Sequence, residues 1–230
     1  MSDRSLSQSP VDPSVEGLPG IGSSSDELGA GVDIAGQVYG PAFESISQYV
    51  DILRYRGIEW GLLGPREEPR LWDRHVLNSA ALSSVIGEGL RVADVGSGAG
   101  LPGLPLAILR PDLEIVLIES LLRRANFLEL AVEELGLGDR VTVVRSRSED
   151  WRETVDVVTC RAVAPLSKLL AWTKHLWLPD GQLVALKGSS VVKEIDQASA
   201  LLARLKLVPE VRQVRAHPAA ETTSALIVRR

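Results

Sequence analysis

The stretch from Arg91 to Leu106, which reads RVADVGSGAGLPGLPL, combines an acidic residue with a run of glycines. The acid is Asp94, and glycines follow it at positions 96, 98, 100 and 103. Glycine tolerates positive φ and has no side chain that would hold a ligand away from the backbone. An apolar run precedes the glycines and residues able to start a helix follow them. The stretch therefore predicts a cofactor-binding corner of an α/β sheet, close to a nucleotide-like molecule.

These glycines match two cofactor patterns. Residues 98 to 103 satisfy the GxGxxG pattern of dinucleotide-binding turns, but a lone match of this kind is weak. Asp94 lies in the predicted strand, where the dinucleotide pattern usually has an apolar residue. Pro102 and Pro105 also remove N–H donors that a pyrophosphate would need at the helix start. S-adenosylmethionine has no phosphate, so the turn favours this cofactor over NAD.

Further candidate residues follow other predicted strands. An open parallel sheet binds its ligand beyond the carboxyl ends of its strands, where the winding reverses. This rule selects Glu119, residues 146–149, Arg161 and Lys187. Glu119 lies 25 residues after Asp94, where a carboxylate can accept hydrogen bonds from both ribose hydroxyls. Taken alone, Glu119 could equally be a surface charge at the end of a strand.

The elements that would position these residues alternate along the chain. Strands are predicted in the run that ends at Asp94 and at residues 114–119, 141–145, 155–162, 182–187, 208–214 and 224–228. Helices are predicted over 41–57, from about Pro69, and over 121–135, 165–176 and 192–205. The apolar, buried stripes of the helices over 121–135 and 192–205 should begin at Leu121 and Val192. These elements predict an α/β fold with a seven-stranded, mostly parallel sheet and helices on both faces. The final two strands should be antiparallel, because no crossover helix fits between them.

Charge divides the chain at about residue 40. The first 40 residues hold six acids and one base, whereas residues 41–230 hold 24 of each. Ser, Pro, Gly and Asp dominate the start, so residues 1–35 are predicted to be a disordered acidic leader. Residues 36–88 should form an N-terminal helical extension, and residues 89–230 the cofactor-binding domain. A neutral body argues against a coat protein held on nucleic acid by a broad positive field, and is compatible with a local basic site.

Cysteine and histidine usage limits the chemistry. The single cysteine, Cys160, excludes an intramolecular disulfide and a thiolate zinc cluster. It lacks the Pro-Cys context of a cytosine methyltransferase, and an alternating strand would turn it away from Arg161, so we expect a small buried packing residue. The three histidines are scattered, and no metal site is expected. With no signal-peptide core and no long apolar run, we expect a cytoplasmic protein that does not enter the membrane, and a monomer.

Several segments together resemble one protein family. In order along the chain they are LWDRHVLNSAAL, VADVGSGAGLPGLPLAIL, LIES, RSRSED, VVTCRAVAP and VALKG. From about Phe43 to its end, the sequence is identified as a member of the RsmG (GidB) family of bacterial ribosomal RNA methyltransferases. The resemblance implies a Rossmann-like class I S-adenosylmethionine-dependent methyltransferase fold. It also implies methylation of N7 of a specific guanine in 16S ribosomal RNA, with S-adenosyl-L-methionine as cofactor and 16S ribosomal RNA or the assembling small subunit as partner.

The resemblance also assigns roles to residues. Cofactor contacts are expected from Asp94, Gly96, Gly98, Gly100, Leu101, Glu119, Ser148, Glu149 and Arg161. Asp94 would point towards the methionine end, Glu119 would hold the ribose, and Ser148 with Glu149 would meet the adenine. Arg161 is expected to position the cofactor or the guanine oxygen. No general base is expected, because guanine N7 carries an in-plane lone pair and no proton.

RNA contacts are expected from Arg70, Arg74, His75, Arg123, Arg124 and Lys187 around the cleft. The chain departs from the family pattern at residues 61–63, at Asn78 and at residues 222–223, which bears on the RNA contacts but not on the cofactor site. Two other function classes stay open from the sequence. One is an NAD-dependent oxidoreductase, and the other is a non-catalytic RNA-binding protein with a methyltransferase fold.

Overall fold

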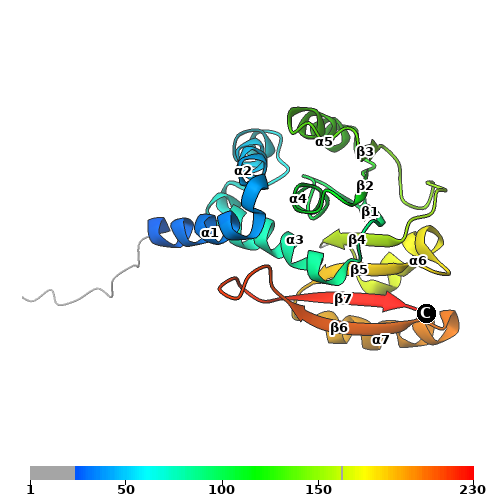
Figure 1. Ribbon diagram of the computed structural model, residues 1–230. Coiled ribbons are helices and arrows are strands. Elements are labelled where there is room, and N and C mark those ends of the chain that lie inside the picture. Colours follow the sequence, from blue (N-terminus) through cyan, green and yellow to red (C-terminus); the bar gives the residue numbers. More distant parts are fainter. Residues whose placement is uncertain (1–23, 162) are drawn as a thin grey trace, which may run out of the picture.

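A computed structural model describes residues 24–161 and 163–230 of the chain (Figure 1). Within these residues, one seven-stranded sheet has the order β3-β2-β1-β4-β5-β7-β6. Strands β1 to β5 pair in parallel, and β7 pairs antiparallel with both β5 and β6. The predicted sheet, including its antiparallel final pair, is confirmed. The strands are β1 Arg91–Val95, β2 Glu114–Ile118, β3 Val141–Val144, β4 Val157–Arg161, β5 Gln182–Lys187, β6 Val208–Val214 and β7 Thr223–Arg229.

The helical elements cover both faces of this sheet (Figure 1). The α-helices are α1 Ser24–Tyr39, α2 Phe43–Ile52, α3 Asn78–Ala80, α4 Gly103–Leu109, α5 Leu122–Glu134, α6 Leu166–Trp177 and α7 Val191–Leu205. Shorter 3-10 segments are Gly40–Ala42, Pro65–Arg70 and Ala81–Val85, and π-helical segments are Leu53–Gly57 and Leu71–Leu77. Among the residues that the structure describes, no helix is long and apolar enough to cross a membrane.

Strand residues alternate between two apolar cores. Val92 of β1 packs in the core under α1, α2, α4 and α5, whereas its neighbour Ala93 packs in the core under α6 and α7. Both faces are buried because successive side chains of a strand point to opposite sides. The chain winds outward from β1 through β2 to β3 and then returns to β4, which lies on the other side of β1. The winding therefore reverses between β1 and β4, where an open sheet binds its ligand.

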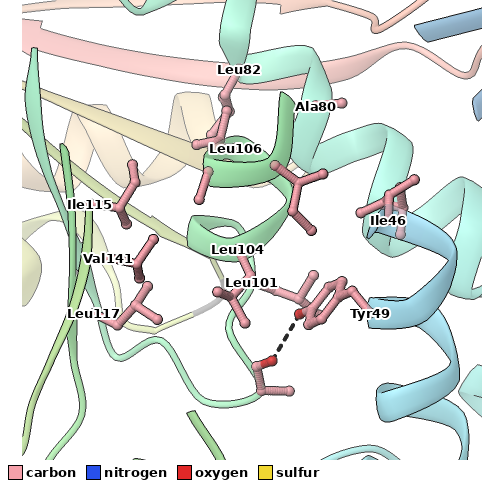
Figure 2. Close-up of a cluster of buried hydrophobic side chains, with 14 of the residues drawn as sticks. Ile46, Tyr49, Ala80, Leu82, Leu101, Leu104, Leu106, Ile115, Leu117 and Val141 are labelled. Carbon is pink, nitrogen blue, oxygen red and sulfur yellow. Dashed lines mark hydrogen bonds between the residues drawn. The ribbon is translucent and has the colours of Figure 1, made fainter. Parts of the chain in front are cut away.

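Helix α4 lies within the core that is under α1, α2, α4 and α5. Figure 2 shows its Leu104 and Leu106 between the strand residues Ile115 and Leu117 on one side and Ile46 of α2 on the other. Side chains of the N-terminal helices and of the sheet thus belong to one apolar cluster. The proposed boundary at residues 88 and 89 stays a prediction, and no break in the core marks it among the described residues.

The expected disorder up to residue 35 is wrong for residues 24–35. Helix α1 begins at Ser24, and the first 23 residues of the predicted leader lie outside the described part. The buried residues Gly31, Ala35 and Tyr39 recur every four positions. Two of them are small, and a Cβ atom added to Gly31 would lie 2.8 Å from Asp73 Oδ1. Small residues at helical spacing let α1 approach the segment Leu71–Leu77 closely. A composition rich in Ser and Gly predicts disorder, although here it belongs to a packed helix.

Three other boundary predictions are corrected. Helix α5 starts at Leu122, and Leu121 before it has an extended backbone. Leu121 is therefore outside the buried stripe of the helix, and 54% of it is exposed. Val192 is 61% exposed, and Val191 occupies the buried position in the first turn of α7. The second helical segment starts at Pro65 rather than near Pro69, which lies inside its 3-10 turn.

Candidate functional site

The glycine turn connects β1 to α4, and three of its positions have backbone angles that favour glycine. Gly96, Gly98 and Gly100 have φ values of +70°, +58° and +95°. A Cβ atom on Gly100 would lie 2.5 Å from Leu104 Cδ1. Side chains at this position would therefore be strained and would also collide with α4.

Asp94 lies beneath this turn. Its Oδ2 atom accepts a hydrogen bond from the Gly103 N–H at 3.0 Å, at the start of α4, while Oδ1 has no partner among the described residues. Burial raises the pKa of Asp94 to about 7. An internal carboxylate thus occupies the helix N-terminus that a pyrophosphate would need. Among the described residues, Asp94 is not part of the lining of the two cavities next to the turn. Its expected orientation towards the methionine end stays a prediction.

Two tyrosines of the N-terminal helices also support the turn and α4 behind it, a role that no sequence pattern indicated. The Tyr49 hydroxyl of α2 donates to the Ala99 carbonyl oxygen at 2.8 Å (Figure 2). The Tyr39 hydroxyl of α1 donates to the Pro105 carbonyl oxygen at 3.4 Å. Burial raises the pKa of both hydroxyls, which keeps them protonated donors. The N-terminal helices are therefore part of the support of the turn.

A smaller cavity of about 240 Å³ opens at the ends of β1, β2 and β3. Its lining includes Gly96, Glu119, Ser148, Glu149 and Trp172. Glu119 is buried, with Oε2 accepting from the Gly98 N–H at 3.1 Å and Oε1 from the Leu121 N–H at 2.9 Å. Each carboxylate oxygen keeps a further lone pair. This fixed pair of acceptors can bind two vicinal hydroxyls, as a ribose presents them.

The main cavity adjoins the smaller one and has a volume of about 880 Å³. The two cavities share Gly96 and Val163 as lining residues. Other residues of the main cavity come from the N-terminal segments, the glycine turn, the strands β4, β5 and β7, and the helices α5 and α7: Leu62, Leu63, Glu67, Arg74, His75, Asn78, Leu101, Arg124, Arg161, Lys187, Glu194 and Thr223. A ligand can therefore extend from one cavity into the other past the glycine turn.

A chain of hydrogen bonds fixes Arg161 at the wall of the main cavity. Arg161 donates to His75 Nδ1, and His75 Nε2 lies 2.8 Å from Glu67 Oε2. Because a guanidinium only donates, Nδ1 must be unprotonated, and Nε2 carries the proton that is donated to Glu67. Burial, followed by the charge of Arg161, lowers the pKa of His75 to about 4. His75 is therefore neutral at neutral pH, and Arg161 keeps one defined orientation.

Lys187 fixes the loop after β4. Its Nζ donates to the Ala164 carbonyl oxygen at 2.8 Å and to Glu194 Oε2 at 2.7 Å. Glu194 also accepts a hydrogen bond from the Leu166 N–H at 3.0 Å. Only 7% of the Lys187 side chain is exposed. Lys187 and Glu194 thus hold both sides of Pro165 and, with it, the loop that carries Val163.

The expected RNA contacts divide into two groups. Arg74, His75, Arg124 and Lys187 line the main cavity, but only Arg74 and Arg124 are well exposed. Arg70 and Arg123 are exposed residues outside its lining, as far as the described residues show. All three positions at which the chain departs from the family pattern contribute to the lining, through Leu62, Leu63, Asn78 and Thr223.

The remaining expectations concern sulfur and metal chemistry. Cys160 is buried in the core under α6 and α7, which confirms the expected packing role, and burial raises the pKa of its thiol to about 12. In the described part of the chain, no group of three or more His, Cys, Asp or Glu side chains is placed to hold a metal ion. Ala162, in the predicted RAVAP segment, lies outside the described residues.

Comparisons with known proteins place the chain in a family. A family described as GidB, rRNA small subunit methyltransferase G, matches residues 42–219. The ribosomal RNA small subunit methyltransferase G of Streptomyces avermitilis is 50% identical over 185 residues, which cover 79% of this chain and 77% of that protein. Its counterpart in Mycolicibacterium gilvum is 51% identical over 178 residues, covering 75% and 78%.

Solved structures agree at the level of the fold. A ribosomal protein L11 methylase from Lactobacillus delbrueckii subsp. bulgaricus has a TM-score of 0.51 and 16% identity, covering 66% of this chain and 76% of that one. The sheet order is that of a Rossmann-like methyltransferase, as expected. The match to the family and the identity to its members, over three quarters of the chain or more, show that this protein belongs to the rRNA small subunit methyltransferase G (GidB) family.

Proposed function

We propose that this protein transfers the methyl group of S-adenosyl-L-methionine to N7 of a specific guanine in 16S ribosomal RNA. Its family membership supports methyl transfer to small-subunit ribosomal RNA. The structural observation that carries the proposal is the pair of adjoining cavities on the two sides of Gly96 and Val163. One cavity offers acceptors to a nucleoside, and the other is wide enough for a second reactant.

The smaller cavity fits the adenosine part of the cofactor. Glu119 accepts hydrogen bonds from the two ribose hydroxyls, and Ser148 and Glu149 border the adenine. Gly96, Gly98 and Gly100 let the remainder of the molecule pass over the turn towards the main cavity, beside Leu101. S-adenosyl-L-methionine supplies an electrophilic methyl group on its sulfonium. The Asp94–Gly103 hydrogen bond, which occupies the helix N-terminus, favours this phosphate-free cofactor over NAD.

The main cavity holds the guanine. Arg161, fixed by His75 and Glu67, donates hydrogen bonds to the guanine oxygen or to the cofactor and aligns the two reactants. Guanine N7 has no proton to lose, so the chain needs no general base. Holding reactants in line and excluding water can lower a barrier substantially. Arg161 is accordingly a positioning group.

We place the protein in the cytoplasm as a monomer, acting on 16S ribosomal RNA or on the assembling small subunit. Transfer of radioactive methyl groups from S-adenosyl-L-methionine to both substrates tests the reaction, and nucleoside analysis identifies the methylated atom. N7-methylguanine at one position is expected. Arg161→Ala should reduce transfer at saturating cofactor, while Arg204→Ala, on exposed α7 surface, should not. Label on another atom, or full turnover of Arg161→Ala, would contradict the proposed roles.

Two control measurements separate the alternatives. Saturable binding of NAD without binding of S-adenosylhomocysteine would favour an oxidoreductase. RNA binding without methyl transfer would favour a non-catalytic RNA-binding protein. We expect binding of S-adenosylhomocysteine together with methyl transfer.

A further inference from the structure

A third cavity, of about 380 Å³, lies where the segment after α2 meets the start of α5. This Trp60 cavity is lined by Glu59, Trp60, Leu122, Arg123 and Asn126. We propose that it binds an unpaired nucleobase of the RNA substrate, close in the RNA to the methylated guanine. This inference rests on the proposed function and adds a substrate subsite to it.

The walls of the Trp60 cavity are aromatic and aliphatic. Trp60 packs against Phe127 with its ring centroid at 5.9 Å and an interplanar angle of 63°, so the buried core holds the indole in place. Beside it, Leu122 is 56% exposed, although most large apolar side chains of the described residues are buried. Single-stranded bases stack on aromatic side chains, and this stacking is tolerant of sequence. The apolar wall thus offers a stacking surface for one base.

The polar groups suit a neutral heterocycle better than a phosphate. The lining has one guanidinium, one carboxylate and one amide, and an Arg123 N–H donates to the Glu59 carbonyl oxygen at 3.4 Å. The formal charges of Arg123 and Glu59 cancel. Together with Asn126 they provide both donors and acceptors for the edge of a base. A phosphate would meet the carboxylate of Glu59 at close range, which disfavours it.

The residues that line the Trp60 cavity are close in sequence to residues that line the main cavity. Leu62 and Leu63 line the main cavity, only two and three residues after Trp60. In α5, Arg124 lines the main cavity and its neighbour Arg123 lines the Trp60 cavity. The same two segments therefore border both cavities. Proteins that read unpaired RNA splay successive bases into separate pockets, so an RNA strand with its guanine in the main cavity can place a nearby base beside Trp60.

Binding of purified wild-type and variant protein to 16S ribosomal RNA tests this inference. Trp60→Ala should raise the dissociation constant roughly 5- to 150-fold, the range for loss of one base–aromatic stack. Trp60→Phe, which keeps a ring, should recover most of the affinity. Leu122→Ala should weaken binding several-fold, whereas Val192→Ala, which shortens an exposed aliphatic side chain on α7, should leave it unchanged. The dissociation constant for S-adenosylhomocysteine should not change in any variant.

Each outcome decides for or against the inference. Wild-type RNA affinity in folded Trp60→Ala would overturn it, and if that variant does not fold, wild-type affinity in Leu122→Ala would do the same. Dimers that dissociate on Leu122→Ala, with RNA affinity unchanged, would assign this surface to a second copy of the chain. Absence of methyl transfer by the wild-type protein is a separate result, because it contradicts the proposed function and leaves a ring-dependent loss of RNA binding standing.

Discussion

Replacement of His75 by alanine should remove the side-chain hydrogen bond that orients Arg161 and leave only its longer contact with the Arg74 carbonyl oxygen, at 3.4 Å. His75 is 4% exposed and forms two hydrogen bonds, one from Arg161 and one to Glu67. Hydrogen bonds to charged groups contribute about 1.5–3 kcal/mol each. We therefore expect His75→Ala to lower the free energy of unfolding by about 3–6 kcal/mol, measured by urea denaturation, since both charged partners lose a bond.

The same change should affect catalysis through the orientation of Arg161. If the whole contribution of the Arg161–His75 bond acts in the transition state, its loss lowers kcat/KM for RNA by about 10- to 150-fold, because 1.36 kcal/mol corresponds to a factor of ten. The dissociation constant for S-adenosylhomocysteine should change much less, since His75 lies outside the smaller cavity as the described residues define it. Steady-state methyl transfer, with RNA varied at saturating cofactor, measures the effect.

Two variants separate positioning from stability. His75→Asn places an amide oxygen near the position of Nδ1 and should recover part of the lost kcat/KM. His175→Ala removes a histidine that contacts the Trp151 carbonyl oxygen at 3.0 Å, away from both cavities among the described residues, and should leave kcat/KM unchanged. Wild-type kcat/KM in folded His75→Ala would show that the Arg161–His75 hydrogen bond does not position Arg161 for catalysis.

Three further predictions follow from named contacts. Glu119→Ala should raise the dissociation constant for S-adenosylhomocysteine at least tenfold in calorimetry, because two hydrogen bonds to a carboxylate are worth about 3 kcal/mol or more; an unchanged constant would remove the ribose role. Asp94 has a folded-state pKa raised from 3.8 to about 7 by burial, so the folded state binds more protons and unfolding free energy should fall as pH rises between these values. Asp94→Asn should flatten this dependence in urea titrations, and an unaltered slope would exclude Asp94 as its source. Charge reversal of both Arg74 and Arg124 should weaken RNA binding and reduce the slope of log affinity against log salt by about two, whereas an unchanged slope would argue against phosphate contacts there.

The sheet was predictable because its strands are buried on both faces. Parallel strands covered by helices consist of apolar runs, as in residues 114–118 and 157–161. A helix lies between successive parallel strands except between β3 and β4 in the described residues. Once the strands are known, the rule for open sheets places Glu119 and Arg161 at one edge. The structure has both residues at that edge, one beside each cavity.

The supports of the site were not predictable in the same way. Tyr49 and Ala99 are 50 residues apart, and His75 and Arg161 are 86 apart. Periodicity indicates that a side chain is buried, but it does not identify a partner on a distant element. The burial of His75 against Arg161 is therefore visible only in the fold, because it depends on how the N-terminal segments pack on the sheet. The burial of Lys187 against Glu194 likewise depends on how the loop after β4 packs.

Mapping of N7-methylguanine in small-subunit ribosomal RNA is the most direct test of whether this protein methylates N7 of one guanine there. RNA is compared from cells with the protein, cells without it, and cells that carry Arg161→Ala in its place. We expect one N7-methylguanine that disappears without the protein and is strongly reduced with Arg161→Ala. An identical set of N7-methylguanines in cells with and without the protein would exclude the proposed activity.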